Sequence, residues 1–347
     1  MAMKNIADRQ DRILEIIVSS YVDTALPVGS RSVSKILGFS SATIRNIMAD
    51  LEEMGYITHP HTSAGRIPTD KGYRHYVESL MRLKDINKKE AKLIDEEYRY
   101  RRRNIDDIIK KTALILSTIT HQTGIILFPR FKRSVFKHID LIHIGRRKVL
   151  AVMVTSSGII KNLIIDTEED IEKDLDAIAN LLNGDYYGIT LDDIRERLIR
   201  RLRQERDSFY HVMRQTTTMI DSMLELLRED ELCLGGASCL LSQPEFEDAD
   251  LAKPLLRVFE DKNVLSRMLE GDLDKEGIAV YIGKENKYKD IQNCALVTSG
   301  YKVRGELIGR LGIIGPTRMD YDYLIPLVGY ISGTVTRILN ELVEFDG

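Results

Sequence analysis

Apolar residues recur at helical spacing through the first part of the chain. Between Asn5 and Thr24 they return every three or four positions, and charged residues occupy much of the opposite side. This period predicts an amphipathic helix of about five turns. Pro27 and Gly29 end the pattern, because proline restricts the residue before it and glycine loosens the chain.

Two further helical patterns follow, separated by a tight turn. The first spans residues 31–37, with Ser30 as its expected N-cap. The second begins near Ser41 and ends at Gly55, which suits a left-handed cap. The apolar positions expected to pack inside are Val33, Ile36, Leu37, Ile44, Ile47, Met48, Leu51 and Met54. Two helices joined by a short turn containing glycine predict a helix-turn-helix.

Two short extended segments, residues 56–58 and 67–69, flank a loop of turn-forming residues directly after the second helix. Paired segments in this place predict a wing. Thr69 is expected to cap one more helix, from Asp70 to Leu83. Residues 1–84 are therefore predicted to form a winged helix-turn-helix domain.

The outward side of the second helix and the wing loop carry the candidate chemistry. Neither the start of that helix, before Asp50, nor the wing loop holds an acid. Arg can pair with guanine and Asn with adenine in a major groove, and the free N–H groups at a helix start favour phosphate. The wing loop suits a phosphate backbone or a minor groove. The residues predicted to contact DNA are Arg31, Ser40, Ser41, Thr43, Arg45, Asn46, His61, Thr62, Ser63 and Arg66. A three-helix domain with a polar first turn and no nucleic-acid role stays open as the alternative.

The remaining residues predict a mixed fold of antiparallel strands and helices. Residues 85–123 have the pattern of a long connecting helix, and short strands linked by tight turns then predict an antiparallel meander. Helical patterns cover residues 171–182 and 191–227. Later strands are expected at 232–234, 279–282, 295–301 and 307–314, before a closing helix at 321–342. This order is that of a GAF-like domain if residues 135–230 are an insertion between its first two strands.

The net charge of the chain argues less strongly against DNA binding than it first suggests. The chain has 347 residues and a formal net charge of -3, which by itself argues against a nucleic-acid partner. Residues 1–84 nevertheless carry 11 basic against 9 acidic side chains, while residues 231–347 carry 13 against 19. The acidic excess therefore lies in the C-terminal third, and the N-terminal part can still bind DNA.

Other classes of function find little support in the sequence. No stretch is long and apolar enough for a spanning helix and no signal peptide is recognisable, so we expect a soluble, cytoplasmic protein. The three cysteines lack C-x-x-C spacing, and His59 and His61 have only His75 near them, so no metal or other cofactor is expected. No catalytic set of side chains is recognisable, and the protein is predicted not to be an enzyme.

Several motifs closely resemble the HrcA family of heat-inducible transcription repressors. In the N-terminal part they are residues 27–31, 41–46, 48–52 and 61–73, and nearer the C-terminus residues 243–246 and 312–321. The resemblance implies a repressor of chaperone operons that binds an inverted-repeat operator, the CIRCE element, as a homodimer, with the chaperonin GroEL as a partner that keeps it active.

The resemblance also implies a domain organisation. The parts are a winged-helix domain at 1–84, a linker helix with the first part of a GAF-like domain at 85–134, an inserted dimerising domain at 135–230, and the second part of the GAF-like domain at 231–347. The expected fold class is thus α+β, with an N-terminal winged helix-turn-helix and a GAF-like antiparallel domain that carries an inserted α/β dimerising domain.

Two other functions stay open at the sequence level. A metabolite-sensing regulator could be gated through a GAF-like pocket, in which Arg304, Arg310 or Arg318 could meet an anion. Alternatively, the winged helix could contact a protein instead of DNA.

Overall fold

The computed structural model describes residues 6–61, 64–99, 105–128, 135–156, 158–203, 210–229, 232–273 and 275–345. The chain divides into two compact units. The first comprises Met1–Ile126, Leu234–Gly300 and Arg310–Thr334, and the second comprises Leu127–Cys233, Tyr301–Gly309 and Val335–Gly347. This division does not test the four predicted domain boundaries, which stay a prediction.

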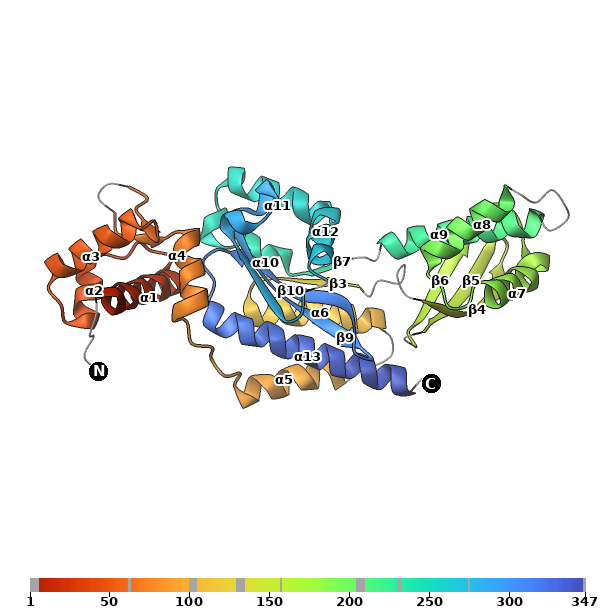
Figure 1. Cartoon of the computed structure of the whole chain (residues 1–347), viewed down its shortest axis with the longest axis horizontal. Coiled ribbons are helices and arrows are strands. Elements are labelled where there is room, and N and C mark those ends of the chain that lie inside the picture. The colour runs from red at the N-terminus through yellow and green to blue at the C-terminus, as the bar shows by residue number, and fades with distance from the viewer. Residues whose placement is uncertain are drawn as a thin grey trace. The chain divides into compact units, whose positions relative to one another are not determined.

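The N-terminal part of the first unit is a winged helix-turn-helix (Figure 1). Its elements are α1 (Ile6–Thr24), α2 (Ser30–Leu37), α3 (Ser41–Glu53), β1 (Ile57–Thr58), β2 (Ile67–Pro68) and α4 (Asp70–His75). Apolar residues of α1 and α3, among them Ile13, Leu14 and Ile44, are fully buried, as their helical spacing predicts. The two short strands pair antiparallel, with Ile57 opposite Pro68, and form the base of the wing.

A five-stranded sheet with surrounding helices is the next part of the fold. Its strands are β3 (Thr123–Leu127), β7 (Leu232–Gly235), β8 (Ile278–Ile282), β9 (Cys294–Val303) and β10 (Glu306–Pro316), in the order β7-β3-β10-β9-β8. The helices are α5 (Lys88–Arg99), α6 (Ile105–Thr120), α10 (Ala237–Leu241), α11 (Ala249–Glu260), α12 (Asn263–Gly271) and α13 (Tyr321–Phe345). The pairs β3–β10 and β8–β9 are antiparallel, in agreement with the expected α+β class.

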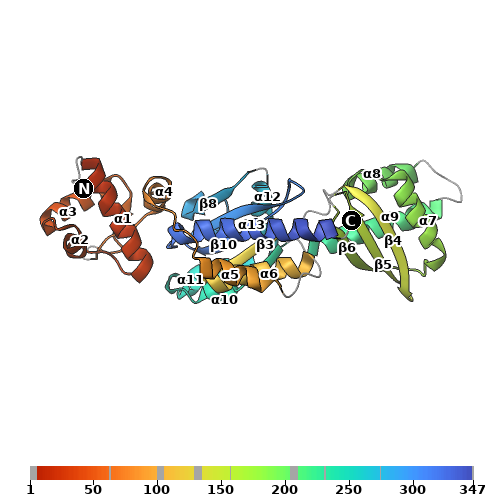
Figure 2. The same cartoon turned by 90° about the horizontal axis from the view of Figure 1, so that it is seen from below.

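The second unit contains the predicted antiparallel meander. Strands β4 (Phe136–Gly145), β5 (Lys148–Thr155) and β6 (Ile160–Asp166) pair in that order. Helices α7 (Leu175–Asp185), α8 (Leu191–Leu202) and α9 (Tyr210–Glu229) complete it, and Figure 2 shows them gathered on one side of the sheet. Side chains alternate along each strand, so that one sheet face is buried and the other is open.

Several boundaries differ from the sequence prediction. The helix expected over 70–83 is α4 followed by a π-helical turn at Tyr76–Leu80, because Met81 already has an extended backbone. The helical region expected over 85–123 contains two helices, α5 and α6, and the pattern over 191–227 likewise contains α8 and α9. Periodicity alone does not mark these ends, since the apolar spacing continues across them.

Three details of the helix-turn-helix were also wrong. Ser30 is the first residue of α2 and not its cap, because Gly29 holds the N-cap position. Ile36 is 59% exposed, since so short a helix turns only Val33 fully inward. Met54 is 44% exposed, because α3 ends at Glu53 and the next position no longer continues its buried face. Gly55 does adopt the predicted left-handed conformation, with φ +76°.

Candidate nucleic-acid interface

Helix α3 presents its polar N-terminal end to solvent. The Ser40 hydroxyl caps the helix, because its oxygen accepts a hydrogen bond from the backbone N–H of Thr43 at 3.1 Å. Its apolar residues fill the core, which leaves the polar ones outside. Of the predicted contacts on α3 and its cap, four are exposed and Ser41 is half-buried; the exposed ones are Ser40, Thr43, Arg45 and Asn46.

Arg45 and Asn46 have the longest hydrogen-bonding side chains at this end of α3. Both are exposed, and within the described part of the chain neither side chain has a hydrogen bond or ion pair. No acidic residue precedes Asp50 on the helix, so an approaching phosphate backbone meets no negative charge. The pair is therefore free to reach base edges in a major groove.

The turn before α3 is fixed by local contacts. Gly38 has φ +74°, a left-handed conformation that glycine adopts without steric cost, and its N–H donates to the Ser34 carbonyl. The Ser34 hydroxyl donates to the Phe39 carbonyl at 2.6 Å. The Arg9 guanidinium lies 5.4 Å from the centre of the Phe39 ring. These contacts fix the direction in which α3 leaves the turn.

The other predicted contact residues lie around α3. Arg31 and His61 are exposed, on α2 and in the wing loop respectively, and neither side chain has a partner among the residues that the structure describes. Thr62 and Ser63 lie outside those residues. Of the ten predicted residues, the structure thus leaves six exposed: Arg31, Ser40, Thr43, Arg45, Asn46 and His61.

The base of the wing is tied to the loop that follows α1. Val28 and Arg66 exchange two backbone hydrogen bonds, each 2.8 Å long. A Cβ on Gly65 would lie 2.7 Å from backbone atoms of Pro27, so only glycine allows this close approach. The motifs at residues 27–31 and 61–73 therefore meet in space and position the wing beside α3.

The Arg66 side chain points to a carboxylate rather than freely into solvent. Its Nη2 lies 2.8 Å from Oε2 of Glu52, on the last turn of α3, and the other oxygen of the same carboxylate bonds His59. The sequence predicts that Arg66 contacts DNA with a free guanidinium. In this structure the guanidinium, 26% exposed, links the wing to α3.

The structure does not bring the N-terminal histidines together as a metal site. His59 pairs with Glu52, while His75 lies 3.0 Å from Asp11 and stacks on the Tyr56 ring. A cluster that the sequence did not predict lies in the second unit instead. There His143, Asp170 and Glu172 each offer one donor atom, all within 4.8 Å of one another. The Nε2 of His143 lies 3.8 Å from Oδ1 of Asp170 and its Nδ1 lies 3.6 Å from Oε1 of Glu172, and both distances are longer than a hydrogen bond.

The three arginines considered for an anion are bound by the protein itself. Arg310 is fully buried and donates to the backbone carbonyls of Asp272, Lys275 and Gly277. Burial lowers its pKa despite these bonds. Arg318 pairs with Glu245, and the Arg304 side chain donates to the Ser156 carbonyl at 3.4 Å. These contacts favour structural roles for all three.

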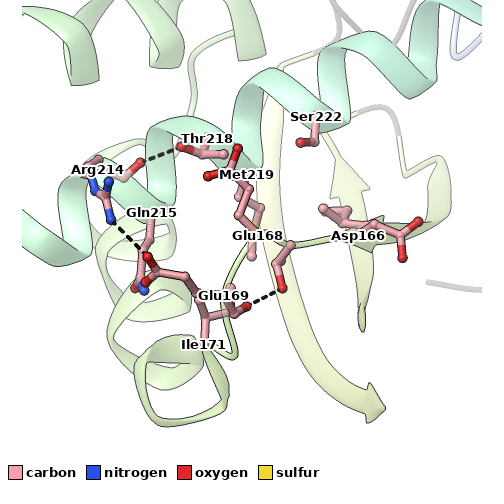
Figure 3. Close-up of a pocket in the computed structure, with 11 residues that line it drawn as sticks. Asp166, Glu168, Glu169, Ile171, Arg214, Gln215, Thr218, Met219 and Ser222 are labelled. Carbon is pink, nitrogen blue, oxygen red and sulfur yellow. Dashed lines mark hydrogen bonds and ion pairs between the residues drawn. The ribbon is translucent and has the colours of Figure 1, made fainter. Parts of the chain in front are cut away.

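A pocket lies in the second unit, between the loop after β6 and helix α9 (Figure 3). Its lining mixes carboxylates with an arginine, and Arg214 lies 3.8 Å from Glu169 across it. Asp166 and Glu168 also line it. It is formed by residues 165–222 and so contains none of the three arginines through which metabolite gating was considered.

The fold and this surface define a winged helix-turn-helix DNA-binding regulator. Comparisons with known proteins give the family. Residues 5–81 match the family model described as a winged helix-turn-helix transcription repressor, HrcA DNA-binding, and residues 106–325 match the HrcA protein C terminal domain. The chain belongs to the HrcA family of heat-inducible transcription repressors, which are regulators and not enzymes.

The similarity to curated relatives covers both chains almost completely. The heat-inducible transcription repressor HrcA of Pelotomaculum thermopropionicum is 38% identical over 98% of this chain and 99% of its own length. That of Geobacter sulfurreducens is also 38% identical, over 97% and 99%. A solved structure described as a hypothetical protein has a TM-score of 0.63 at 24% identity, over 96% of this chain and 99% of its own, and supports the fold. No helix among the described residues is long and apolar enough to cross a membrane.

Proposed function

We propose that this repressor binds an inverted-repeat operator, the CIRCE element, upstream of chaperone operons as a homodimer, and that the GroEL chaperonin tunes its activity. It works in the cytoplasm, where the operator is. The observation that carries the proposal is the exposure of Arg45 and Asn46 at the start of α3, where neither side chain has a partner among the described residues. In this proposal Arg45 and Asn46 read bases, while Arg31, Ser40, Ser41, Thr43, His61, Thr62 and Ser63 contact the backbone.

Arg66 has a different part in this proposal. Because its guanidinium pairs with Glu52, it acts mainly by holding the wing against α3. Contact between its remaining nitrogens and phosphate is secondary.

The homodimer is supported by the open face of the β4–β5–β6 sheet. Ile142, Ile144, Ile160 and Ile164 are all more than 40% exposed there, and strand pairing places Leu150 between Ile142 and Ile164. Contiguous apolar side chains on one sheet face mark an association surface. A second copy is the occupant proposed, because an inverted repeat needs two recognition helices related by a two-fold axis and a self-complementary face provides one.

The role of the chaperonin is carried over from the family resemblance. The same exposed apolar face offers a chaperonin a surface to bind whenever the protein is monomeric. In this proposal, heat-damaged proteins occupy the chaperonin, the repressor loses its assistance and the operator is released.

DNase I footprinting tests the operator proposal directly. The full chain should protect an inverted repeat upstream of chaperone genes, and a duplex with both half-sites scrambled should show no protection at the same concentration. Uniform protection of both duplexes would refute sequence-specific binding.

A reconstitution experiment tests the chaperonin proposal. Heat-treated repressor should regain operator binding faster with GroEL than with an equal mass of serum albumin. Addition of an unfolded competitor protein should cancel that gain. Equal recovery in all three mixtures would refute the proposed tuning.

A further inference from the structure

Residue Arg74 of helix α4 bonds to a segment more than two hundred positions away in the sequence. Its Nε donates to Oε1 of Glu285 at 2.7 Å, and its Nη2 donates to the Val280 carbonyl at 2.7 Å. Glu285 in turn accepts from the backbone N–H of Ile282, which fixes the carboxylate in place. Although burial alone would raise the pKa of Glu285, the bonds from Arg74 and Ile282 lower it, so the pair is ionised at neutral pH.

The same contact zone includes the start of α4. The Asp70 carboxylate accepts a hydrogen bond from the backbone N–H of Lys284 at 3.0 Å. The neighbouring Gly283 has φ +55°, and a Cβ there would lie 2.2 Å from the Asp70 carboxylate. Only glycine therefore allows this approach of the two segments.

A second arginine, which lies in the C-terminal part of the chain, bonds to the N-terminal domain. Arg318 lies between β10 and α13 and is bidentate to Glu245, with its Nε 2.6 Å from Oε1. Its Nη1 donates to the Val22 carbonyl in the last turn of α1 at 2.8 Å. Carbonyls at a helix C-terminus have no partner within the helix, so a cation there is well placed. The Arg318 side chain is only 13% exposed.

Two more contacts reinforce these pairs. The Tyr76 hydroxyl donates to Asp322 at 2.7 Å, and Lys84 pairs with Asp320 at 2.7 Å. The bonds of Arg74, Asp70, Tyr76 and Lys84, and the bond of Arg318 to Val22, join residues 22–84 to residues 280–322, while Glu245 holds Arg318 in place. None of them involves α2 or α3, so the predicted recognition surface stays open.

We propose that Arg74, Arg318 and their partners Glu285 and Glu245, together called the arginine clamp, are positioning residues that hold the winged helix at a fixed place on the sheet that follows it. This inference rests on the proposed binding to an inverted repeat. Because the recognition helix then keeps a fixed place relative to that sheet, the clamp narrows the range of half-site spacings that a dimer accepts.

Without the clamp, the winged helix is held less firmly, by contacts such as those of Tyr76 and Lys84, and in the limit residues 81–87 act as a tether. A flexible chain of that length spans about 15 Å between its ends, and neighbouring base pairs are about 3.4 Å apart. A tethered domain can therefore reach half-sites displaced by several base pairs. It binds the preferred spacing more weakly, because it loses the pre-organisation that makes the second contact nearly intramolecular.

The experiment measures binding to duplexes whose two half-sites are moved closer or apart by one to four base pairs. The clamp variant is Glu245→Gln with Glu285→Gln, which keeps side-chain shape and removes the charge of both partners. The matched control is Glu247→Gln with Glu260→Gln, since both are exposed carboxylates outside the clamp and remove the same charge. A duplex with one half-site is titrated alongside.

Wild type and control should show a sharp optimum of spacing. Relative to the control, the clamp variant should lose about tenfold in affinity at that optimum, lose much less at shifted spacings and bind the single half-site equally well. An unchanged spacing profile would overturn the proposal, as would an equal loss on half-site and full site, which indicates a folding role. Tighter binding by the variant would also overturn it, because the clamp would then be inhibitory. Wild type that binds none of the duplexes refutes the proposed function itself.

A charge reversal keeps the test valid if the double variant unfolds. Arg74→Glu should broaden the spacing profile, and Arg74→Glu combined with Glu285→Arg should restore the sharp optimum. Failure of the reversed pair to restore it, with both proteins folded by circular dichroism, would count against the clamp.

Discussion

Arg45 is the residue from which sequence specificity is expected to come. Replacement of Arg45 by Ala removes a guanidinium from an exposed position without disturbing the core. We expect a loss of about 1–3 kcal/mol in specific binding, together with weaker discrimination at one base pair of each half-site. Titration by gel shift on the operator and on single-base variants measures both.

The control for this substitution is Arg267→Ala on α12, an exposed arginine far from α3 in sequence. It removes the same charge and should leave discrimination intact. If Arg45→Ala binds every duplex as wild type does, Arg45 does not read bases.

The pair formed by Arg66 and Glu52 distinguishes a wing-holding role from direct contact with phosphate. If the pair holds the wing, Glu52→Gln and Arg66→Ala should both weaken operator binding, by about threefold to tenfold, which is the usual range for the net contribution of one hydrogen bond. If Arg66 acts mainly on phosphate, Glu52→Gln should instead strengthen binding, because it frees the guanidinium and removes a negative charge. Fluorescence anisotropy over a range of salt concentrations separates the two, since lost phosphate contacts also lower the salt slope.

Residue types and their order predicted an exposed polar helix end, but not the pairing of side chains around it. The absence of acids near residues 40–46 indicated an exposed polar helix end, and that end is exposed. The pairing of Arg66 depended on Glu52, which lies 14 positions earlier and meets Arg66 only once the wing folds back. The partners of Arg74 and Arg318 could not be predicted from the sequence either, because they lie far away along the chain.

At the level of elements, the open face of the β4–β5–β6 sheet decides the oligomeric state in our proposal. Ile142→Asp combined with Ile164→Asp places two charges on either side of Leu150 in the middle of that face. We expect the dimer to dissociate at concentrations about a hundredfold higher than wild type, because charges buried without partners are costly. Light scattering coupled to gel filtration measures the mass.

Leu256→Asp provides the matched control on another element. Leu256 is 40% exposed on α11, outside the sheet face, so its replacement should leave the dimer intact. If the Ile142 and Ile164 variant remains a dimer, the interface does not lie on this sheet face. If both variants dissociate, the effect is not specific to the face.

Elements were more predictable than their ends. Alternating strands separated by tight turns gave the order β4-β5-β6, and that order is observed. The predicted helix over 70–83 stops at Leu80, because its last turn widens and its backbone then becomes extended. Such an end depends on tertiary contacts, here including the bond of Tyr76 to Asp322, and leaves no signal in the local apolar period.

For the whole molecule, the net charge of -3 bears on how the repressor moves among random DNA sites. The acidic excess lies in residues 231–347, whose contribution to the field at α3 is a long-range one. Replacing exposed Glu247, Glu260 and Glu306 by Gln should therefore strengthen binding to random duplex and to operator by the same factor, about twofold to fivefold at low salt. The ratio of operator affinity to random-duplex affinity should not change, since the base contacts are the same.

Salt gives the contrast that identifies this effect. The screening length falls from about 30 Å at 0.01 M to about 10 Å at 0.1 M, so the gain should shrink strongly over that range. Loss of a base contact would behave differently, because it changes the ratio of operator to random affinity at every salt concentration. A gain confined to random DNA, or one that persists at 0.5 M salt, would show that these carboxylates act locally. If instead both affinities rise together and the gain fades with salt, the acidic C-terminal third weakens binding to random DNA and to the operator equally and leaves the discrimination between them unchanged.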